Sequence, residues 1–202
     1  MSFDPNLHGF GAALASAYQR KVDVLNRGFS GYNTDWAMPV LRQLLPTVED
    51  QKKLATSAYL MTIFFGANDA SLPFSFQHVP LERFQANLEK MISLIKDPAS
   101  PYYNPGLRIL LVTPPPLNES QWEKCCIEKG EPMNRSAEVT RTYADMVRHV
   151  GQQANVAVAD IWTRLTDRAR EEQQDLSHYS FDGLHLNPNG NKVIKRSYRK
   201  KT

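Results

Sequence analysis

Short apolar runs alternate with amphipathic segments along this chain. Each run is rich in aliphatic or β-branched residues and is too short to form a helix of its own. These features predict four strands, at residues 22–25, 59–65, 108–112 and 156–161.

The segments between these runs repeat their apolar residues every three or four positions, which is typical of amphipathic helices. Strands that alternate with helices indicate βαβ units, so we expect an α/β fold with a parallel sheet and helices on both faces. A last helix is expected after Pro188. The four predicted helix faces are Phe10, Leu14, Ala17 and Tyr18; Trp36, Val40, Leu41, Leu44 and Leu45; Phe84, Leu88, Met91, Ile92 and Ile95; and, in a helix at 136–152, Val139, Tyr143, Met146, Val147 and Val150.

Composition adds the size and class of the protein. The chain has 202 residues, of which 42% are apolar and 22% charged, as in an ordinary soluble domain. No apolar run approaches the roughly 20 residues that span a bilayer. The first residues lack the basic and apolar regions of a signal peptide. We expect a single domain at 1–191, without a membrane span.

The net charge of +3 is unevenly distributed. The last eleven residues hold six basic and no acidic side chains, which leaves 18 basic and 21 acidic side chains in the rest. A nucleic-acid-binding surface would spread its basic residues over a folded face. We therefore expect 192–202 to be a solvated basic tail, and we do not expect nucleic acid as a partner.

The two cysteines, Cys125 and Cys126, are adjacent. Neighbouring cysteines close a disulfide only through a strained ring, and nothing nearby supplies the further ligands of a zinc site. Free thiols in a reducing compartment are expected, which, with no signal peptide, predicts a cytoplasmic protein.

Polar residues and glycines follow the predicted strands, at the sheet edge where doubly wound folds bind their ligands. Asp182 precedes His185 by three positions, so its carboxylate could hold the imidazole Nδ1–H and leave Nε2 as a general base. Asn68 could donate its amide to an oxyanion, and Gly31 its backbone N–H. The alternatives are a helix cap with a surface histidine, and ordinary turns. The glycine loop matches no nucleotide-binding motif.

In combination, these motifs resemble the SGNH (GDSL-type) hydrolases, whose blocks follow the order Gly-Asp-Ser, Gly, Gly-x-Asn-Asp and Asp-x-x-His. The last three blocks are present as Gly31, Gly66-Ala67-Asn68-Asp69 and Asp182-Gly183-Leu184-His185. The sequence is also similar to the isoamyl acetate-hydrolysing esterase branch. That similarity rests on further segments: Arg27 to Tyr32 with Trp36, Phe65 to Ala70, Val79-Pro80-Leu81, Thr113 to Pro116, and Trp122-Glu123-Lys124.

The resemblance implies a flavodoxin-like three-layer α/β/α sandwich that hydrolyses short-chain, acetate-like esters through a serine acyl-enzyme. It implies that His185 is the base, Asp182 its orienting acid, and Gly31 and Asn68 the oxyanion donors. It also implies a small ester as the ligand and neither metal nor organic cofactor. A homo-oligomer is compatible with the sequence.

The chain departs from the family in one respect, because Gly-Asp-Ser occurs nowhere in it. Neither Ser2 nor Ser30 is expected to replace the family's nucleophile, since a nucleophile needs hydrogen-bond reach to its base. In the family order 2-1-3-4-5, the strand that carries this block is central. We expect a truncated chain from an incomplete gene model. The alternative is an inactive paralogue that at most binds a small ester or acid.

The segment 118–135 is rich in Glu and Lys and follows the third predicted strand. We expect a loop there. It could cap the acyl or alcohol pocket, or it could be a solvated insertion, and the sequence favours neither.

Overall fold

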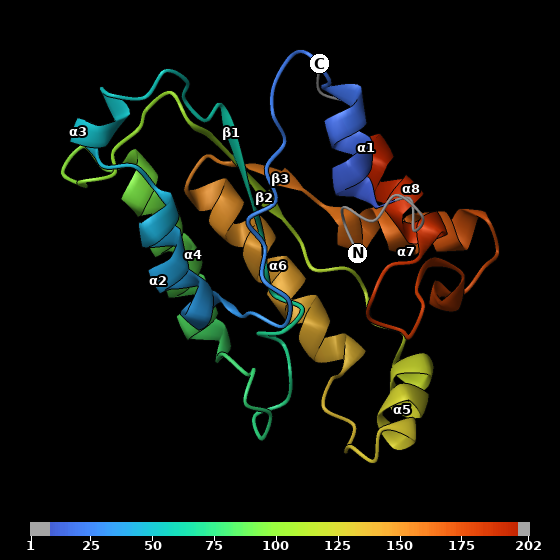
Figure 1. Ribbon diagram of the computed structural model, residues 1–202. Helices are drawn as coiled ribbons and strands as arrows, with labels where there is room; N and C mark the ends of the chain where they lie inside the picture. Colours follow the sequence, from blue (N-terminus) through green and yellow to red (C-terminus); the bar gives the residue numbers. More distant parts are fainter. Residues whose placement is uncertain (1–8, 198–202) are drawn as a thin grey trace. The chain divides into compact units, whose positions relative to one another are not determined.

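The computed structural model describes residues 9–197, and it describes side chains up to residue 194 (Figure 1). Close backbone contacts group the chain into two compact units. The sheet unit comprises Gly31–Pro114 and Glu138–Asp160, and the dyad unit comprises the chain up to Ser30, Pro115–Ala137, and the chain from Ile161 onward.

The sheet unit contains the three parallel strands β1 (Leu60–Phe64), β2 (Arg108–Val112) and β3 (Ala157–Ala159), hydrogen-bonded in the order β1-β2-β3. Leu60 is aligned with Arg108, and Leu110 with Ala157. The second, third and fourth predicted strands are therefore confirmed, as is their parallel pairing. The last strand is shorter than predicted because Ile161 already belongs to the next helix.

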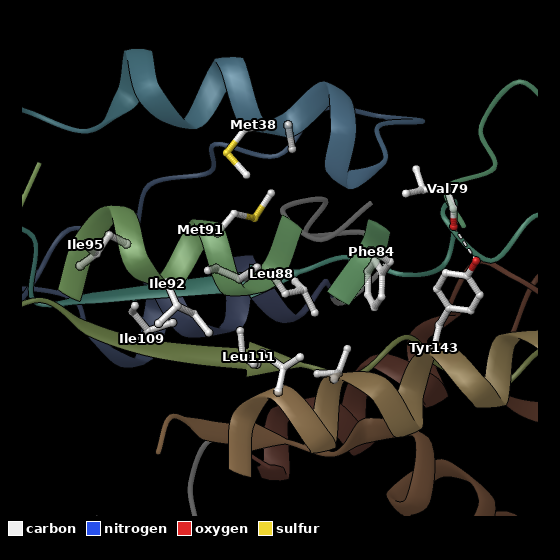
Figure 2. Packing of buried hydrophobic residues seen from close by; sticks show 14 of the residues in the cluster. Met38, Val79, Phe84, Leu88, Met91, Ile92, Ile95, Ile109, Leu111 and Tyr143 are labelled. Atoms are coloured by element: carbon white, nitrogen blue, oxygen red, sulfur yellow. Dashed lines mark hydrogen bonds between the residues drawn. The ribbon is translucent and has the colours of Figure 1, made fainter. Parts of the chain in front are cut away.

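The helices of the sheet unit are α2 (Thr34–Leu44), α3 (Val48–Gln51), α4 (Leu81–Lys96) and α6 (Ala137–Gln153). Of these, α2, α4 and α6 share a hydrophobic core with the strands, whereas α3 has no buried residue. Side chains alternate between the two faces of a strand. Ile63, Ile109 and Leu111 belong to one hydrophobic core with residues of α2, α4 and α6, and Figure 2 shows Ile109 and Leu111 within this core. The face predicted for α4 is fully buried.

The face predicted for α2 is partly wrong. Trp36 and Leu44 are exposed, and the buried positions are Ala37, Met38 and Leu45. The helix carries apolar residues around more than one face, so periodicity alone did not show which of them packs against α4. Figure 2 shows Met38 directed toward Met91 of α4.

The dyad unit contains α1 (Phe10–Ala17), α5 (Glu119–Glu128), α7 (Ile161–Glu171), a short 3-10 helix η1 (Leu176–Tyr179) and α8 (Pro188–Ser197). Its small core includes Leu165 and Ala169 of α7 together with Tyr179. The helix predicted around Phe10 and the last predicted helix are confirmed, whereas α7 was not predicted.

The strand predicted at 22–25 is wrong. This segment has no regular structure, and Val22 and Leu25 are 50% and 68% exposed. A strand needs a neighbour for its backbone hydrogen bonds, and within residues 9–197 β1 pairs with β2 alone. The run is also only four residues long and is interrupted by Asp23, so it buries too little apolar surface to remain extended.

The expected loop at 118–135 contains helix α5, so that expectation is wrong as well. The side chain of Asn118 caps the helix by accepting a hydrogen bond from the backbone N–H of Gln121, at 3.1 Å. Trp122 and Cys126, four residues apart, are the buried residues of its inner face. Both cysteines are free thiols.

The boundary predicted at residue 191 lies inside α8, which continues through Ser197. The end of the predicted tail, 198–202, lies outside the described residues. Among the helices the structure describes, none has the length and apolar character of a membrane span. The cytoplasmic location stays a prediction.

Candidate active site

Asp182 and His185 form a hydrogen-bonded dyad in the dyad unit. Nδ1 of His185 lies 2.7 Å from Oδ2 of Asp182, while the backbone N–H groups of Leu184 and His185 donate to Oδ1 at 3.0 and 2.8 Å. Burial by itself raises the pKa of Asp182, but these hydrogen bonds outweigh burial and lower that pKa to about 2. The carboxylate therefore stays ionised and orients the ring, with Nε2 on its far side.

A tight turn between the two residues depends on Gly183. Its φ is +91°, a conformation that residues with a side chain rarely adopt. A Cβ atom there would lie 2.3 Å from the carbonyl oxygen of Asn118 and 2.8 Å from the backbone nitrogen of Trp122. The backbone N–H of Asn118 also donates to the carbonyl of Gly183 at 2.9 Å. The start of α5 thus holds the dyad turn in place.

Trp122 contributes a second contact from α5 to the dyad. Its ring centroid lies 6.4 Å from that of the His185 imidazole, and its Nε1–H donates to Oδ1 of Asn134 at 2.9 Å. Two cations lie against the same indole, Arg135 at 5.1 Å and Lys129 at 5.5 Å. Trp122 was not among the predicted site residues. Its i, i+4 spacing with Cys126 is the signal that could have placed both side chains on the inner face of a helix.

The surroundings shift the pKa values of these two cations in opposite directions. Burial lowers the pKa of the Arg135 guanidinium, against the raising influence of Cys126 and Asp182. A hydrogen bond with the Cys125 thiol raises the pKa of the exposed Lys129 ammonium. Both groups lie close enough to Asp182 for its negative charge to raise their pKa values.

The predicted oxyanion donors lie together in the sheet unit. Gly31 has φ +78°, and its carbonyl accepts a hydrogen bond from Nε2 of Gln77 at 2.8 Å. Nδ2 of Asn68 donates to the carbonyl of Tyr32, the residue after Gly31, at 2.8 Å. A carboxamide nitrogen carries two N–H bonds, and this bond fixes the plane in which the second one lies.

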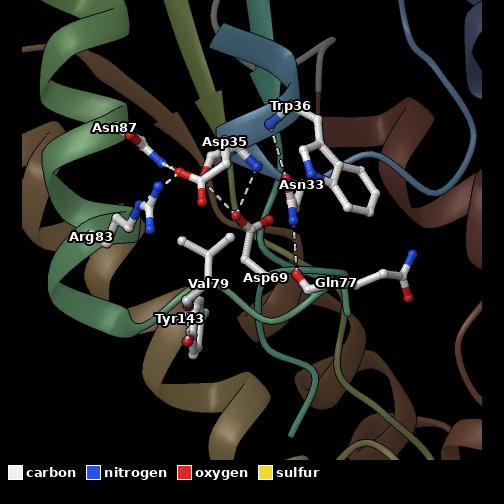
Figure 3. Close-up of polar contacts among 10 residues, drawn as sticks. Asn33, Asp35, Trp36, Asp69, Gln77, Val79, Arg83, Asn87 and Tyr143 are labelled. Atoms are coloured by element: carbon white, nitrogen blue, oxygen red, sulfur yellow. Dashed lines mark hydrogen bonds and ion pairs between the residues drawn. The ribbon is translucent and has the colours of Figure 1, made fainter. Parts of the chain in front are cut away.

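Asp69 holds together the two segments that carry Gly31 and Asn68, a role that the sequence did not predict. Its carboxylate is fully buried at the N-terminus of α2 and accepts from the backbone N–H of Thr34 at 2.8 Å and from the Thr34 hydroxyl at 2.6 Å (Figure 3). It also accepts from the backbone N–H of Gly66 at 3.1 Å. Burial raises the pKa of Asp69, against these hydrogen bonds. The Gly-x-Asn-Asp block therefore joins the loop after β1 to the start of α2.

The structure brings each predicted pair together within its own unit: Asp182 with His185, and Gly31 with Asn68. Ser30 is exposed in the turn before Gly31, and within residues 9–197 it makes no hydrogen bond with His185. Ser2 lies outside the described residues. Among the residues that the structure describes, no three His, Cys, Asp or Glu side chains could hold a metal ion.

Comparison with known proteins identifies the family. The model of the GDSL-like Lipase/Acylhydrolase family matches residues 2–193. The isoamyl acetate-hydrolyzing esterase 1 homolog of Mus musculus is 42% identical over 191 residues, which cover 92% of this chain and 71% of that protein. A GDSL esterase/lipase of Arabidopsis thaliana is 37% identical over 199 residues, covering 96% of this chain and 78% of that protein.

Solved structures share the fold. A lipase/acylhydrolase from Enterococcus faecalis has a TM-score of 0.64 at 23% identity, covering 96% of this chain and 83% of that one. An acetylxylan esterase from Geobacillus stearothermophilus has a TM-score of 0.62 at 20% identity, covering 98% of this chain and 82% of that one. The predicted α/β fold of the SGNH type is thus confirmed, and the chain belongs to the GDSL-like lipase/acylhydrolase family of carboxylic-ester hydrolases.

Proposed function

We propose that this chain provides the base, the orienting acid and the oxyanion donors for hydrolysis of short-chain esters such as isoamyl acetate. The observation that carries the proposal is the 2.7 Å contact between Nδ1 of His185 and Oδ2 of Asp182, with Asp182 held ionised. The name of the mouse relative supports the choice of substrate. The chemistry needs a nucleophile, a base and oxyanion donors, and no cofactor.

In the proposed reaction, a serine hydroxyl attacks the ester carbonyl while Nε2 of His185 takes its proton. The carbonyl oxygen becomes an oxyanion that accepts hydrogen bonds from the Gly31 backbone and the Asn68 amide. Collapse expels the alcohol, which takes the proton from the imidazolium, and an acyl-serine remains. Water then attacks the acyl-serine, with His185 again as base, and releases the acid.

The serine itself is not assigned to any residue of this chain, because its 202 residues contain no Gly-Asp-Ser. This observation supports a second candidate function, in which the chain binds a small ester or acid without turnover. The two candidates share Gly31 and Asn68 and differ in whether an acyl-enzyme forms. We expect loss of the nucleophile to remove about 10⁶-fold of the rate.

A labelling experiment separates the two candidates. The chain is incubated with p-nitrophenyl acetate and, separately, with a fluorophosphonate that modifies activated serines, and the products are read by mass spectrometry. Hydrolysis with a modified serine, both lost in His185→Ala and retained in His149→Ala, would establish the hydrolase. Binding of an ester without either signal would establish the second candidate. His149 is a suitable control because it is an exposed histidine of α6.

A further inference from the structure

Three aromatic rings form an exposed stack in the sheet unit. Trp36 and Phe76 lie nearly parallel, with centroids 5.9 Å apart and 20° between the planes, and Tyr32 meets Trp36 edge-on at 5.9 Å. Phe76 is 81% exposed and Trp36 is 37% exposed. Exposed apolar side chains that lie side by side are typical of surfaces that bind an apolar group. We call Tyr32, Trp36 and Phe76 the aromatic shelf.

Hydrogen bonds tie the shelf to both oxyanion donors. Tyr32 follows Gly31 in the chain, and its carbonyl accepts the Asn68 amide at 2.8 Å. At the other end, Gln77, which follows Phe76, donates to the Gly31 carbonyl at 2.8 Å. The shelf and the two donors thus belong to one hydrogen-bonded loop cluster, and the distance between them is fixed by covalent and hydrogen-bonded neighbours.

Asn33 joins the two aromatic segments. Its Nδ2 donates to the Gln77 carbonyl at 2.9 Å, and its Oδ1 accepts from the Trp36 backbone N–H at 3.0 Å as the cap of α2. Figure 3 shows the Trp36 ring on the side of Asn33 and Gln77, away from Arg83 and Asn87. Arg83 is engaged by Asp35 at 3.0 Å. The groups that frame the shelf are neutral amides, which favours an uncharged ligand.

We infer that the aromatic shelf binds the alkyl chain of the ester whose carbonyl oxygen reaches Gly31 and Asn68. This inference rests on the proposed function and names its substrate class: uncharged esters with an extended apolar chain. The shelf residues determine specificity and touch no reacting atom. Each methylene that the rings remove from water should tighten binding about fourfold.

Binding to the 202-residue chain tests this without requiring turnover. Titration calorimetry is run with n-alkyl acetates, which lengthen the alcohol, with ethyl n-alkanoates, which lengthen the acid, and with n-alkanols, which lack the ester. The expected result is a gain of about fourfold per methylene in one ester series and in the alkanols. Phe76→Ala and Trp36→Ala should abolish that gain, and Trp36→Phe should restore most of it. Phe74→Ala, an exposed aromatic of the same loop outside the stack, should retain it.

The outcomes separate the shelf from the catalytic proposal. A chain-length gain that survives both Trp36→Ala and Phe76→Ala overturns the shelf, as does the absence of binding in all three series. A second outcome is that these variants lose the chain-length gain, while alkyl acetates bind no more tightly than alkanols and Asn68→Ala leaves ester binding unchanged. This outcome supports the shelf and counts against Gly31 and Asn68 as oxyanion donors. Phe76 is highly exposed, so Phe76→Ala should fold normally even if Trp36→Ala disturbs α2. A third outcome is that the wild type shows no chain-length gain and sediments as a dimer, which Phe76→Ala dissociates. In that case the shelf is a contact between two copies of the chain, and the inference fails.

Discussion

Asp182 holds His185 from within a single turn, because the same carboxylate meets the imidazole Nδ1 at 2.7 Å and the His185 backbone N–H at 2.8 Å. Both bonds span three residues, so the dyad's geometry depends on a short segment of sequence. For this reason the Asp-x-x-His spacing allowed this contact, which was one of the alternatives that the sequence left open.

The stability of the fold should depend on pH through Asp182. Its pKa falls from 3.8 to about 2 on folding, so the ionised carboxylate stabilises the folded state above pH 4. This contribution, about 2 kcal/mol, is lost as the pH falls from about 4 through 2. Urea unfolding at pH 7 and at pH 2.5 should show the difference in the wild type and a smaller one in Asp182→Asn. An equal pH dependence in both proteins would show that Asp182 is not the group responsible.

Gly183→Ala should destabilise the protein by about 2–4 kcal/mol, because it combines an unfavourable φ with a clash against the start of α5. Gly130→Ala is the matched control. Gly130 also has a positive φ, +69°, but a Cβ there would meet nothing within 4 Å. Its cost should be about 1 kcal/mol. Equal costs for the two variants in chemical unfolding would refute close packing between α5 and the dyad turn.

Asp69→Asn should cost about 2–3 kcal/mol, because an amide cannot accept all of the hydrogen bonds that Thr34 and Gly66 donate to this buried carboxylate. The same substitution at the exposed Asp145, which pairs with Arg148, should cost less than about 1 kcal/mol. Thermal unfolding of the two variants gives the comparison. A melting temperature of Asp69→Asn close to that of the wild type would contradict the support that Asp69 gives to α2.

Trp122→Phe should retain the packing of α5 and lose the hydrogen bond to Asn134. Because the Trp122 ring lies against that of His185, the variant should displace the imidazole. For a short ester, kcat of the hydrolytically active protein should then fall about tenfold with little change in KM. Trp162→Phe, on α7, is the control. If the free energy of unfolding falls while kcat is unchanged, Trp122 stabilises the fold and does not position His185.

Local patterns predicted the elements of the sheet unit well. The buried face of α4 and the bounds of β2 could be predicted because the apolar residues in these segments are the ones that are mostly buried. The strand predicted at 22–25 failed because a strand is stable only beside a partner, which its own residues cannot reveal. Helix α5 was missed because its apolar positions are few and its cap, Asn118, is a residue equally common in loops.

The candidate site divides in the same way. Asp182 with His185 could be predicted because the contact is local, and Gly31 with Asn68 because the family blocks mark them. The roles of Trp122, Gln77 and Asp69 arise from contacts between segments up to 63 residues apart, such as Trp122 with His185. The spacing of residues within a single sequence does not reveal contacts between distant segments.

Ester hydrolysis by the protein expressed from its native gene is the most direct test of the proposed role of the Asp182–His185 dyad. The substrate is isoamyl acetate, and the proteins compared are the wild type, His185→Ala and His149→Ala. We predict that the wild type and His149→Ala hydrolyse the ester, and that His185→Ala loses at least about 10³-fold in kcat/KM. A rate that His185→Ala leaves unchanged, or the absence of hydrolysis by the wild type, would contradict this role.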